Sequence, residues 1–332
     1  AAEDIAKHLS GYTVVVTKST VPVGTGRDVA GIIAKTNPDA KFDIASNPEF
    51  LREGAAISDF MRPDRVVVGA ETDTACDVMR ALYRPLFLIE TPILFTNLET
   101  SELIKYASNA FLAVKISYIN QMADLCEKVG ANVHDVAKGM GLDKRIGNKF
   151  LHPGPGYGGS CFPKDTLALV KTAEQQSSDL SIVDAVVGYN QARKIAMGDR
   201  VIAAMGGSVA GAKIAILGLA FKPETDDMRD SPSLDIVDAL TKAGAVLRAY
   251  DPKAMEEACH LLPQDVTFCD SATDCLNGTD AAVIVTEWNE FRALTPAQFA
   301  AAMTGRVLVD LRNVYEPDAM QDAGFTYLSI GR

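Results

Sequence analysis

Short apolar runs alternate with amphipathic segments over the first 95 residues of the chain. Three runs, 12–20, 42–50 and 65–71, are apolar with β-branched residues, which is typical of buried parallel strands. Residues 1–10 and 27–36 read as helices. This alternation predicts an α/β layer with a parallel sheet. Three strands make a small sheet and none leads into a glycine fingerprint, so we expect an N-terminally truncated doubly wound domain.

The middle of the chain, residues 96–205, is predicted to be helical. Thr96 and Glu99 have capping-box spacing and Gly130 is a good terminator, which together predict one helix over residues 96–129. Such a helix is about 50 Å long. It exceeds one small domain, so we expect it to connect two domains or to form a subunit interface. Further helices are predicted over residues 133–138, 166–176 and 182–205.

Residues 206–332 are predicted to form a second parallel α/β domain. Strands are expected within residues 210–221, 245–250, 266–268, 281–285 and 306–310, with helices between them. The loop 219–222 and the start of the helix after Pro232 are expected to face phosphate. Arg312 follows a strand end, where a guanidinium can bind phosphate in a bidentate manner. For Arg229 and Arg312, a surface ion pair is the alternative.

Two pairs of polar residues stand four positions apart. Lys105 and Asn109 interrupt the apolar long helix on one face. A lysine there should be partly buried and needs an anionic partner, although a lysine that reaches solvent at the helix edge is the alternative. Glu49 and Glu53 would share a face if their segment were helical. A solvated acidic turn is the alternative for them.

A glycine- and proline-rich stretch, residues 150–165, precedes a predicted helix. Pro163 suits the first turn of that helix, so Cys161 should lie just before a helix N-terminus. The helix dipole favours the thiolate there, and the thiolate is the nucleophilic form. Lys164 adds a positive charge, and Asp165, one turn on, could orient a water or hold a proton. The alternative is an inert, buried cysteine.

The same stretch contains glycines that permit close approach of the backbone to a ligand, Gly156, Gly158 and Gly159. Gly154, Gly156 and Gly159 also spell G-x-G-x-x-G. They follow His152 and a proline rather than a strand, so we reject a dinucleotide fingerprint here.

Composition narrows the function classes. No apolar run reaches about 18 residues, so no membrane span is expected, and the first ten residues do not resemble a signal peptide. The net charge of −11 argues against non-specific nucleic-acid binding. The six cysteines have neither zinc-site nor disulfide spacing, which favours a reduced, cytoplasmic setting without a metal. A cysteine hydrolase that pairs Cys161 with His152 stays an open alternative.

Six motifs distributed along the chain resemble those of the UDP-glucose/GDP-mannose dehydrogenase family. They are KSTVPVGTG, NPEFLREG, ELIKYASNAFLAVKISYINQ, IGNKFLHPGPGYGGSCFPKD, ILGLAFKPETDDMRDSPS and YDP. The cysteine motif is the most specific of them. Its Phe162 resembles the members that act on UDP-glucose, because GDP-mannose relatives usually have Leu there. Ser160 differs from the His of relatives that act on N-acetylmannosaminuronate precursors.

The resemblance implies an incomplete NAD-binding domain over residues 1–95, a central helical dimerisation domain over 96–205 and a UDP-sugar-binding domain over 206–332. It implies NAD as the cofactor, UDP-glucose as the substrate and a homodimer. The reaction would be a four-electron oxidation of C6 through a thiohemiacetal and a thioester on Cys161. Alternatives are a dehydrogenase of another nucleotide sugar and a truncated, non-catalytic UDP-sugar-binding fragment.

The resemblance also implies roles for single residues. The implied catalytic residues are Cys161, Lys105, Asn109, Asp165, Glu49 and Thr20. Contacts to NAD are implied for Thr20, Glu53, Lys164 and Arg229. Contacts to the substrate are implied for Glu49, Phe50, Leu51, Lys105, Asn109, Phe150, Leu151, Gly156, Tyr157, Gly158, Phe221, Lys222 and Arg312.

Overall fold

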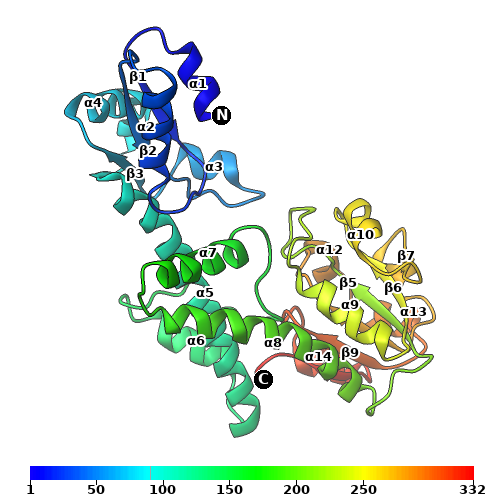
Figure 1. Ribbon diagram of the computed structural model, residues 1–332. Helices are drawn as coiled ribbons and strands as arrows, with labels where there is room; N and C mark the ends of the chain where they lie inside the picture. The colour runs from blue at the N-terminus through cyan, green and yellow to red at the C-terminus, as the bar shows by residue number, and fades with distance from the viewer. Residues whose placement is uncertain (90) are drawn as a thin grey trace. The chain divides into compact units, whose positions relative to one another are not determined.

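The computed structural model of the protein describes the backbone of residues 1–89 and 91–332, and the side chains of 1–86 and 91–332. The chain divides into two compact units. The first contains residues 1–110 and 168–179, and the second contains 111–167 and 180–332. The long helix α5 (Leu98–Val129) has residues in both units (Figure 1).

The first unit has a four-stranded sheet in the order β1-β2-β3-β4. Its strands are β1 (Thr13–Thr17), β2 (Phe42–Ser46), β3 (Val66–Ala70) and β4 (Ile93–Thr96). Its further helices are α1 (Ala2–His8), α2 (Thr25–Thr36), α3 (Ala56–Met61), α4 (Asp73–Leu82) and the 3-10 helix η1 (Arg84–Ile89). Side chains alternate between the faces of the sheet, so Ile44 packs with Ile33 of α2 while Ala45 packs with Met79 of α4.

The pairing in this sheet differs from the predicted one at two points. β1 pairs with β2 and β3 with β4 in parallel, but β2 pairs with β3 antiparallel, and β4 was not predicted. The connection from β2 to β3 contains only α3, which buries no side chain. Without a packed crossover helix, the chain turns back instead of crossing over.

Helix α5 begins one residue later than the capping-box prediction requires. The Thr100 backbone N–H donates to Asn97 Oδ1 at 2.8 Å, so Asn97 caps the helix. The predicted capping role of Thr96 and Glu99 is therefore wrong. The predicted stop is confirmed, since α5 ends at Val129 and Gly130 has a φ of 72°.

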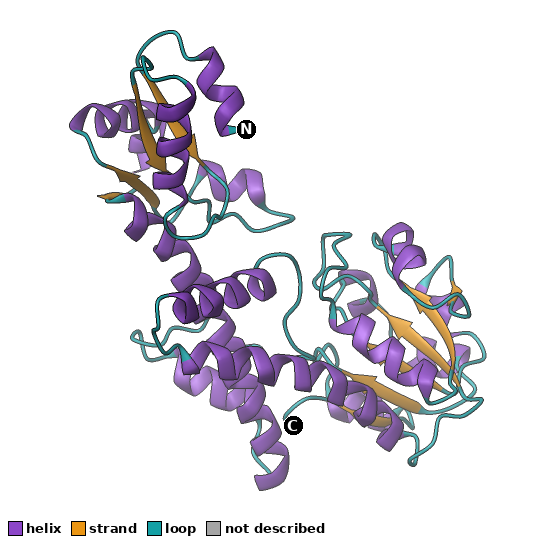
Figure 2. Ribbon diagram, in the orientation of Figure 1, coloured by secondary structure: helices purple, strands orange, loops and turns teal. Residues whose placement is uncertain are grey.

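The second unit has a six-stranded, all-parallel sheet in the order β10-β9-β8-β5-β6-β7. Figure 2 shows strands of this unit in orange and the helices beside them in purple. Its strands are β5 (Lys213–Leu217), β6 (Val246–Tyr250), β7 (Thr267–Phe268), β8 (Ala281–Ile284), β9 (Val307–Asp310) and β10 (Thr326–Leu328). The sequence predicted all of these except β10. The predicted fold class, two sheet domains and a helical part between them, is confirmed.

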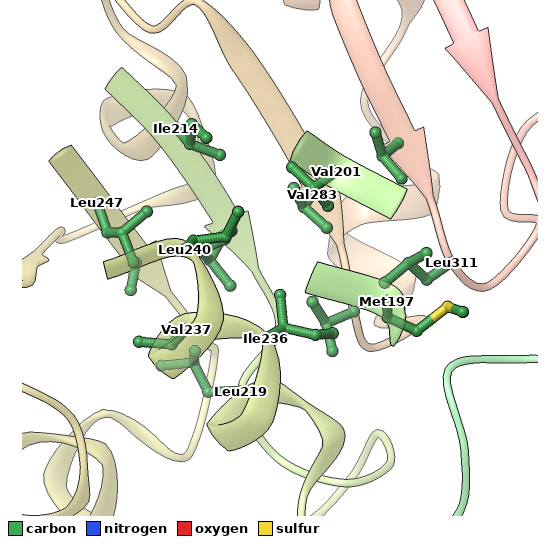
Figure 3. Close-up of a cluster of buried hydrophobic side chains, with 14 of the residues drawn as sticks. Met197, Val201, Ile214, Leu219, Ile236, Val237, Leu240, Leu247, Val283 and Leu311 are labelled. Atoms are coloured by element: carbon green, nitrogen blue, oxygen red, sulfur yellow. The ribbon is translucent and has the colours of Figure 1, made fainter. Parts of the chain in front are cut away.

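Helices cover both faces of this sheet. They are α6 (Val133–Gly141), α8 (Ser181–Ala204), α9 (Pro232–Lys242), α10 (Met255–Leu261), α11 (Ala272–Leu276), α12 (Asn289–Arg292), α13 (Pro296–Ala302) and α14 (Pro317–Asp322). One more helix, α7 (Phe162–Gln175), has residues in both units. Figure 3 shows one face, where Val201 of α8 and Ile236 of α9 meet Ile214 and Val283 of the strands. This core fixes the carboxyl ends of β5 and β8, from which the loops start.

Within residues 1–89 and 91–332, no helix combines the length and the apolar character that a membrane crossing requires.

Candidate functional site

Lys105 is buried in the first unit and has an anionic partner. Its side chain is 4% exposed, and Nζ lies 3.5 Å from Glu49 Oε1. The aromatic ring of Phe50 lies beside it, with Nζ 5.4 Å from the ring centroid. The predicted partly buried lysine is confirmed, and the alternative of a lysine that reaches solvent is wrong. Asn109, one helical turn further along α5, is buried as well.

The loop that carries Glu49 starts at a buried asparagine. Asn47 donates from its side chain to the Val67 carbonyl at 2.7 Å and from its backbone to the Thr17 carbonyl at 2.9 Å, and Tyr83 donates to its Oδ1. These bonds join the ends of β1 and β2 to β3. The loop is thereby fixed where ligands of parallel sheets bind.

Glu49 and Glu53 do not share a helical face, because residues 47–55 contain no helix. The chain extends after Asn47, and Pro48 and the bond from the Leu51 N–H to Glu49 Oε2 hold it in a non-helical form. The solvated acidic turn is also wrong for Glu49, whose side chain is 26% exposed and pairs with Lys105. Thr20 lies in the loop after β1 and is partly buried.

Cys161 lies directly before α7, as predicted. Its carbonyl accepts from the Asp165 N–H at 2.9 Å, so Cys161 is the residue that caps the helix. The residue is exposed, and its Sγ lies 3.6 Å from Ser160 Oγ. The alternative of a buried cysteine is therefore wrong, and the nucleophilic role of Cys161 stays a prediction. An exposed thiol at a helix N-terminus can act as a nucleophile.

The two charged residues that follow Cys161 differ in exposure. Asp165 is buried, whereas the Lys164 side chain is 64% exposed and places Nζ 3.8 Å from Asp165 Oδ1. A lysine in the first helical turn thus lies beside a buried carboxylate. Among the described residues, no group of three or more His, Cys, Asp or Glu side chains could hold a metal ion.

Side chains of α5 and α8 bind the backbone of the loop before Cys161. Gly154 donates to Asn120 Oδ1 at 2.8 Å, and its carbonyl accepts from Arg193 Nε at 2.7 Å. Asn190 accepts from the Tyr157 N–H at 2.8 Å and donates to the Tyr157 carbonyl at 3.0 Å. All three side chains are buried. The loop is therefore fixed through its own backbone. The roles of these three residues were not predicted from the sequence, because each contact joins distant segments.

The glycines of this loop lie against the last domain of the chain. A Cβ at Gly158 would overlap the Asp230 carbonyl, and one at Gly159 would lie 2.6 Å from the Phe221 ring. The Gly159 N–H donates to the Arg229 carbonyl at 2.7 Å. No strand occurs in residues 142–153, so the rejected dinucleotide fingerprint has no strand before it.

Aromatic side chains of the loop gather around the start of α7. The ring of Phe162 makes edge contacts with Tyr157 and with Phe150, at centroid distances of 5.9 Å and 6.2 Å. Phe150 has a φ of 64°, a left-handed conformation that is uncommon for a bulky residue. Leu151 is buried beside it.

Arg312 joins three strand ends in the second unit. Its guanidinium donates to the carbonyls of Val285, at 2.8 Å, and Phe221, at 3.1 Å, and lies 3.1 Å from Glu287 Oε2. Its side chain is mostly buried, so it is more than a surface ion pair. Arg229 is 65% exposed and pairs with the buried carboxylate of Asp227 at 2.8 Å, so the alternative of an ion pair is confirmed for it, although its partner is not at the surface. Lys222 Nζ lies 5.1 Å from the centroid of the Phe221 ring.

The structure thus groups the predicted residues within each unit. Glu49, Phe50 and Lys105 come together in the first, and the Cys161 loop, Phe221 and Arg312 in the second. That Lys105 and Cys161 act on one carbon stays a proposal.

Comparisons with known proteins agree with these features. Residues 1–87, 99–192 and 215–317 match, respectively, the NAD binding domain, the central domain and the UDP binding domain of the UDP-glucose/GDP-mannose dehydrogenase family. The chain is 58% identical to the UDP-glucose 6-dehydrogenase of Rhizobium meliloti, over 100% of this chain and 76% of the relative. It is 45% identical to UDP-glucose 6-dehydrogenase TuaD of Bacillus subtilis, over 100% and 71%.

A solved structure of a UDP-glucose dehydrogenase from Pyrobaculum islandicum has a TM-score of 0.89 and 36% identity. The match covers 98% of this chain and 73% of that one. The UDP-D-ManNAc dehydrogenase of Pyrococcus horikoshii has a TM-score of 0.85 and 26% identity, over 100% and 75%. The chain therefore belongs to the UDP-glucose/GDP-mannose dehydrogenase family of NAD-dependent oxidoreductases.

Proposed function

We propose that the protein oxidises the C6 hydroxyl of UDP-glucose to a carboxylate, a four-electron reaction that consumes two NAD. The observation that carries the proposal is the 58% identity, over the whole chain, to a relative named UDP-glucose 6-dehydrogenase. An exposed cysteine at the N-terminus of α7 and a buried lysine beside Glu49 supply groups that this chemistry needs. The proposed domains are residues 1–95, 96–205 and 206–332.

Two loops of the first unit suit the nicotinamide end of NAD. β1 and β2 are parallel, so the loops with Thr20 and Glu53 start at the same edge of the sheet, where such ligands bind. The N–H groups of Gly24 and Gly26 at the N-terminus of α2 already donate to the Glu102 carboxylate. We assign NAD contacts to Thr20 and Glu53, and also to Lys164 and Arg229. NAD, when bound, supplies the hydride acceptor for both oxidations.

The chain's own residues carry the remaining chemistry. Glu49 takes the proton of the C6 hydroxyl in the first oxidation. Cys161 Sγ then adds to the aldehyde, and the oxyanion of this thiohemiacetal is stabilised by Lys105 and Asn109. The second oxidation leaves a thioester. Asp165, with Thr20, positions water, which transfers its OH to the carbonyl carbon and a proton to the departing sulfur.

The nucleotide is held by the second unit in this proposal. Phe221, Lys222 and Arg312 contact the uridine diphosphate, and Arg312 suits phosphate because its guanidinium donors form a planar fork. The sugar is covered by residues of two loops, Phe50, Leu51, Phe150, Leu151, Gly156, Tyr157 and Gly158. The buried bonds from Asn190 to Tyr157 support a preformed loop.

We also propose a cytoplasmic homodimer. Phe111, Tyr118 and Leu125 stand seven residues apart on α5, nearly on one face, and are 64%, 46% and 50% exposed. A second copy of the chain would cover this stripe. All six cysteines are free, which suits a reducing compartment and a thiol catalyst. Sedimentation of a monomer at micromolar concentration would contradict the dimer.

A substrate assay tests the proposed function. The purified protein is incubated with NAD and UDP-glucose, and NADH and the sugar product are quantified. The proposal requires two NADH per UDP-glucuronate. GDP-mannose and UDP-N-acetylmannosamine serve as competing substrates, and a higher kcat/KM for either would assign the protein to another nucleotide sugar. UDP-glucose binding without any NADH would support the non-catalytic alternative.

Replacing the thiol separates binding from chemistry. Cys161→Ser should abolish formation of the acid, because the hydroxyl forms the covalent adduct poorly, yet leave the Kd for UDP-glucose unchanged. Cys259→Ser, which changes another exposed cysteine, is the matched control and should keep full activity. Retained turnover in Cys161→Ser would remove Cys161 from the mechanism.

A further inference from the structure

A second buried charge lies on the same helix as Lys105, one turn before it. Glu102 is 2% exposed. Its Oε2 accepts from the Gly24 N–H at 2.6 Å, and its Oε1 accepts from the Gly26 N–H at 2.8 Å. Gly24 caps the N-terminus of α2 with a φ of 98°. The carboxylate of α5 thus binds the positive end of another helix.

This arrangement stabilises a charge that would otherwise be costly to bury. Burial raises the pKa of Glu102 above its ordinary value, although the N–H groups of Gly24 and Gly26 act in the opposite direction. The charged groups that act on it are Glu99 on its own helix and Arg27 on α2. A buried carboxylate with two charge-assisted bonds is sensitive to the loss of either oxygen.

Neighbouring contacts fix the same turn of α5. Ser101 Oγ donates to the Ser46 carbonyl at the end of β2, at 3.0 Å. A Cβ at Gly69 of β3 would lie 2.7 Å from Ser101 Cβ, so this strand packs closely against the helix. The first turn of α5 is therefore tied to the ends of three elements: β2, β3 and the loop that leads into α2.

We infer that Glu102 is a positioning residue, which locks the first turn of α5 to the loop 18–24 and so holds Lys105 beside Glu49 and Thr20 in its loop. The inference rests on the proposed function of Lys105 and Thr20. Lys105 follows Glu102 by three residues, so a shift of this turn moves the ammonium group directly. Glu102 itself touches neither substrate nor cofactor in this assignment.

The test compares two carboxylates that join the same two helices. Glu102→Gln keeps the side-chain shape, but its NH2 group faces one of the two backbone N–H groups. Glu99→Gln is the matched control, because Glu99 also binds α2, through Arg27 at 2.7 Å, but is 37% exposed. We expect Glu102→Gln to lower kcat about tenfold with an unchanged Kd for UDP-glucose, and Glu99→Gln to leave both unchanged.

A second readout does not depend on activity. Acylation of lysines by an N-hydroxysuccinimide ester is followed by mass spectrometry at Lys105 and at Lys194. Lys194 is equally buried but pairs with Asp235 in the other unit, so it reports general loosening. Glu102→Gln should raise the acylation rate of Lys105 about tenfold relative to Lys194. A purely structural role would raise both rates together, and that result would overturn the inference.

Gly26→Ala is the second variant, for the case that Glu102→Gln does not fold. Its Cβ would lie 3.2 Å from both Glu102 Oε1 and Leu98 Cδ1, so it crowds the carboxylate without removing it. Acylation of Lys105 should rise here too, by less. If the folded variants keep kcat and Lys105 acylation within about twofold of the parent, the inference is wrong. If the parent itself makes no NADH from UDP-glucose, the proposed function fails, while the acylation ratio still decides the positioning role.

Discussion

Lys105 in the first unit and Cys161 in the second are held in place by different kinds of contact. The ammonium group is buried beside the Glu49 carboxylate, and the carboxylate of Glu102 fixes the preceding turn. The thiol is exposed, and its loop is fixed through its backbone, by bonds from Asn190 and Arg193 and by glycines without room for a methyl group. A buried charge requires a counter-charge, whereas a nucleophile must stay accessible and can be supported only through its backbone.

The largest effect is expected where a charge is removed. Lys105→Met keeps the apolar stem and deletes the ammonium group. If Lys105 stabilises the oxyanion at C6, kcat should fall about 10²- to 10³-fold while the Kd for UDP-glucose changes little. Steady-state kinetics and calorimetry measure the two quantities. Lys128→Met, on the exposed end of the same helix, should be neutral, and a kcat above a tenth of the parent value in Lys105→Met would contradict the role.

A smaller effect is expected where a methyl group is added to the Cys161 loop. Gly158→Ala should lower the free energy of unfolding by about 1–3 kcal/mol, because the new Cβ overlaps the Asp230 carbonyl, which is backbone. Gly188→Ala is the control. Gly188 lies within α8 with open space around its Cβ position, so this change should stabilise the protein by about 0.5–1 kcal/mol. Denaturant titration distinguishes the two signs.

The comparison of Lys105 with Cys161 also shows which features of the site could be predicted from the sequence. The burial of Lys105 was predictable, because a charge in a nearly apolar helix needs a partner. The position of Cys161 directly before a helix followed from Pro163, whereas its exposure is a finding of the structure. Each of these signals lies within one short segment. Local patterns therefore indicated both candidate groups.

The partners of these groups were not predictable, because they depend on contacts between distant segments. Glu102 binds N–H groups 78 and 76 residues away, and Asn190 binds Tyr157 at 33 residues. The antiparallel pairing of β2 with β3 is of the same kind. One signal was present for Glu102: it is a second charge within the apolar helix, three residues before Lys105. A charge within an apolar helix needs a partner, and this reasoning predicts a partner for Glu102 as well as for Lys105.

The second unit also contains a buried carboxylate, that of Asp310. It shows whether the kind of contact depends on the unit or on the charge of the group that is held in place. Asp310 accepts from the Arg312 N–H at 3.0 Å, from the Val314 and Tyr315 N–H groups at 2.7 Å and 3.1 Å, and from the Tyr327 hydroxyl at 2.8 Å. It shapes the turn that carries the Arg312 guanidinium. A charged group in this unit is therefore also positioned by a charge.

The smallest expected effect is a pH dependence at this residue. Burial raises the pKa of Asp310 above its ordinary value of 3.8, so the folded state binds a proton more readily than the unfolded state. Its contribution to stability is then greatest below pH 3.8 and is lost as the pH rises through the raised pKa. Asp310→Asn cannot titrate. The difference in free energy of unfolding between the parent and Asp310→Asn should therefore grow in favour of the parent as the pH falls from 7 towards 4. Urea titrations of both proteins across this range measure it, and a difference that stays constant or shrinks would show that ionised Asp310 is as well accommodated in the fold as in water.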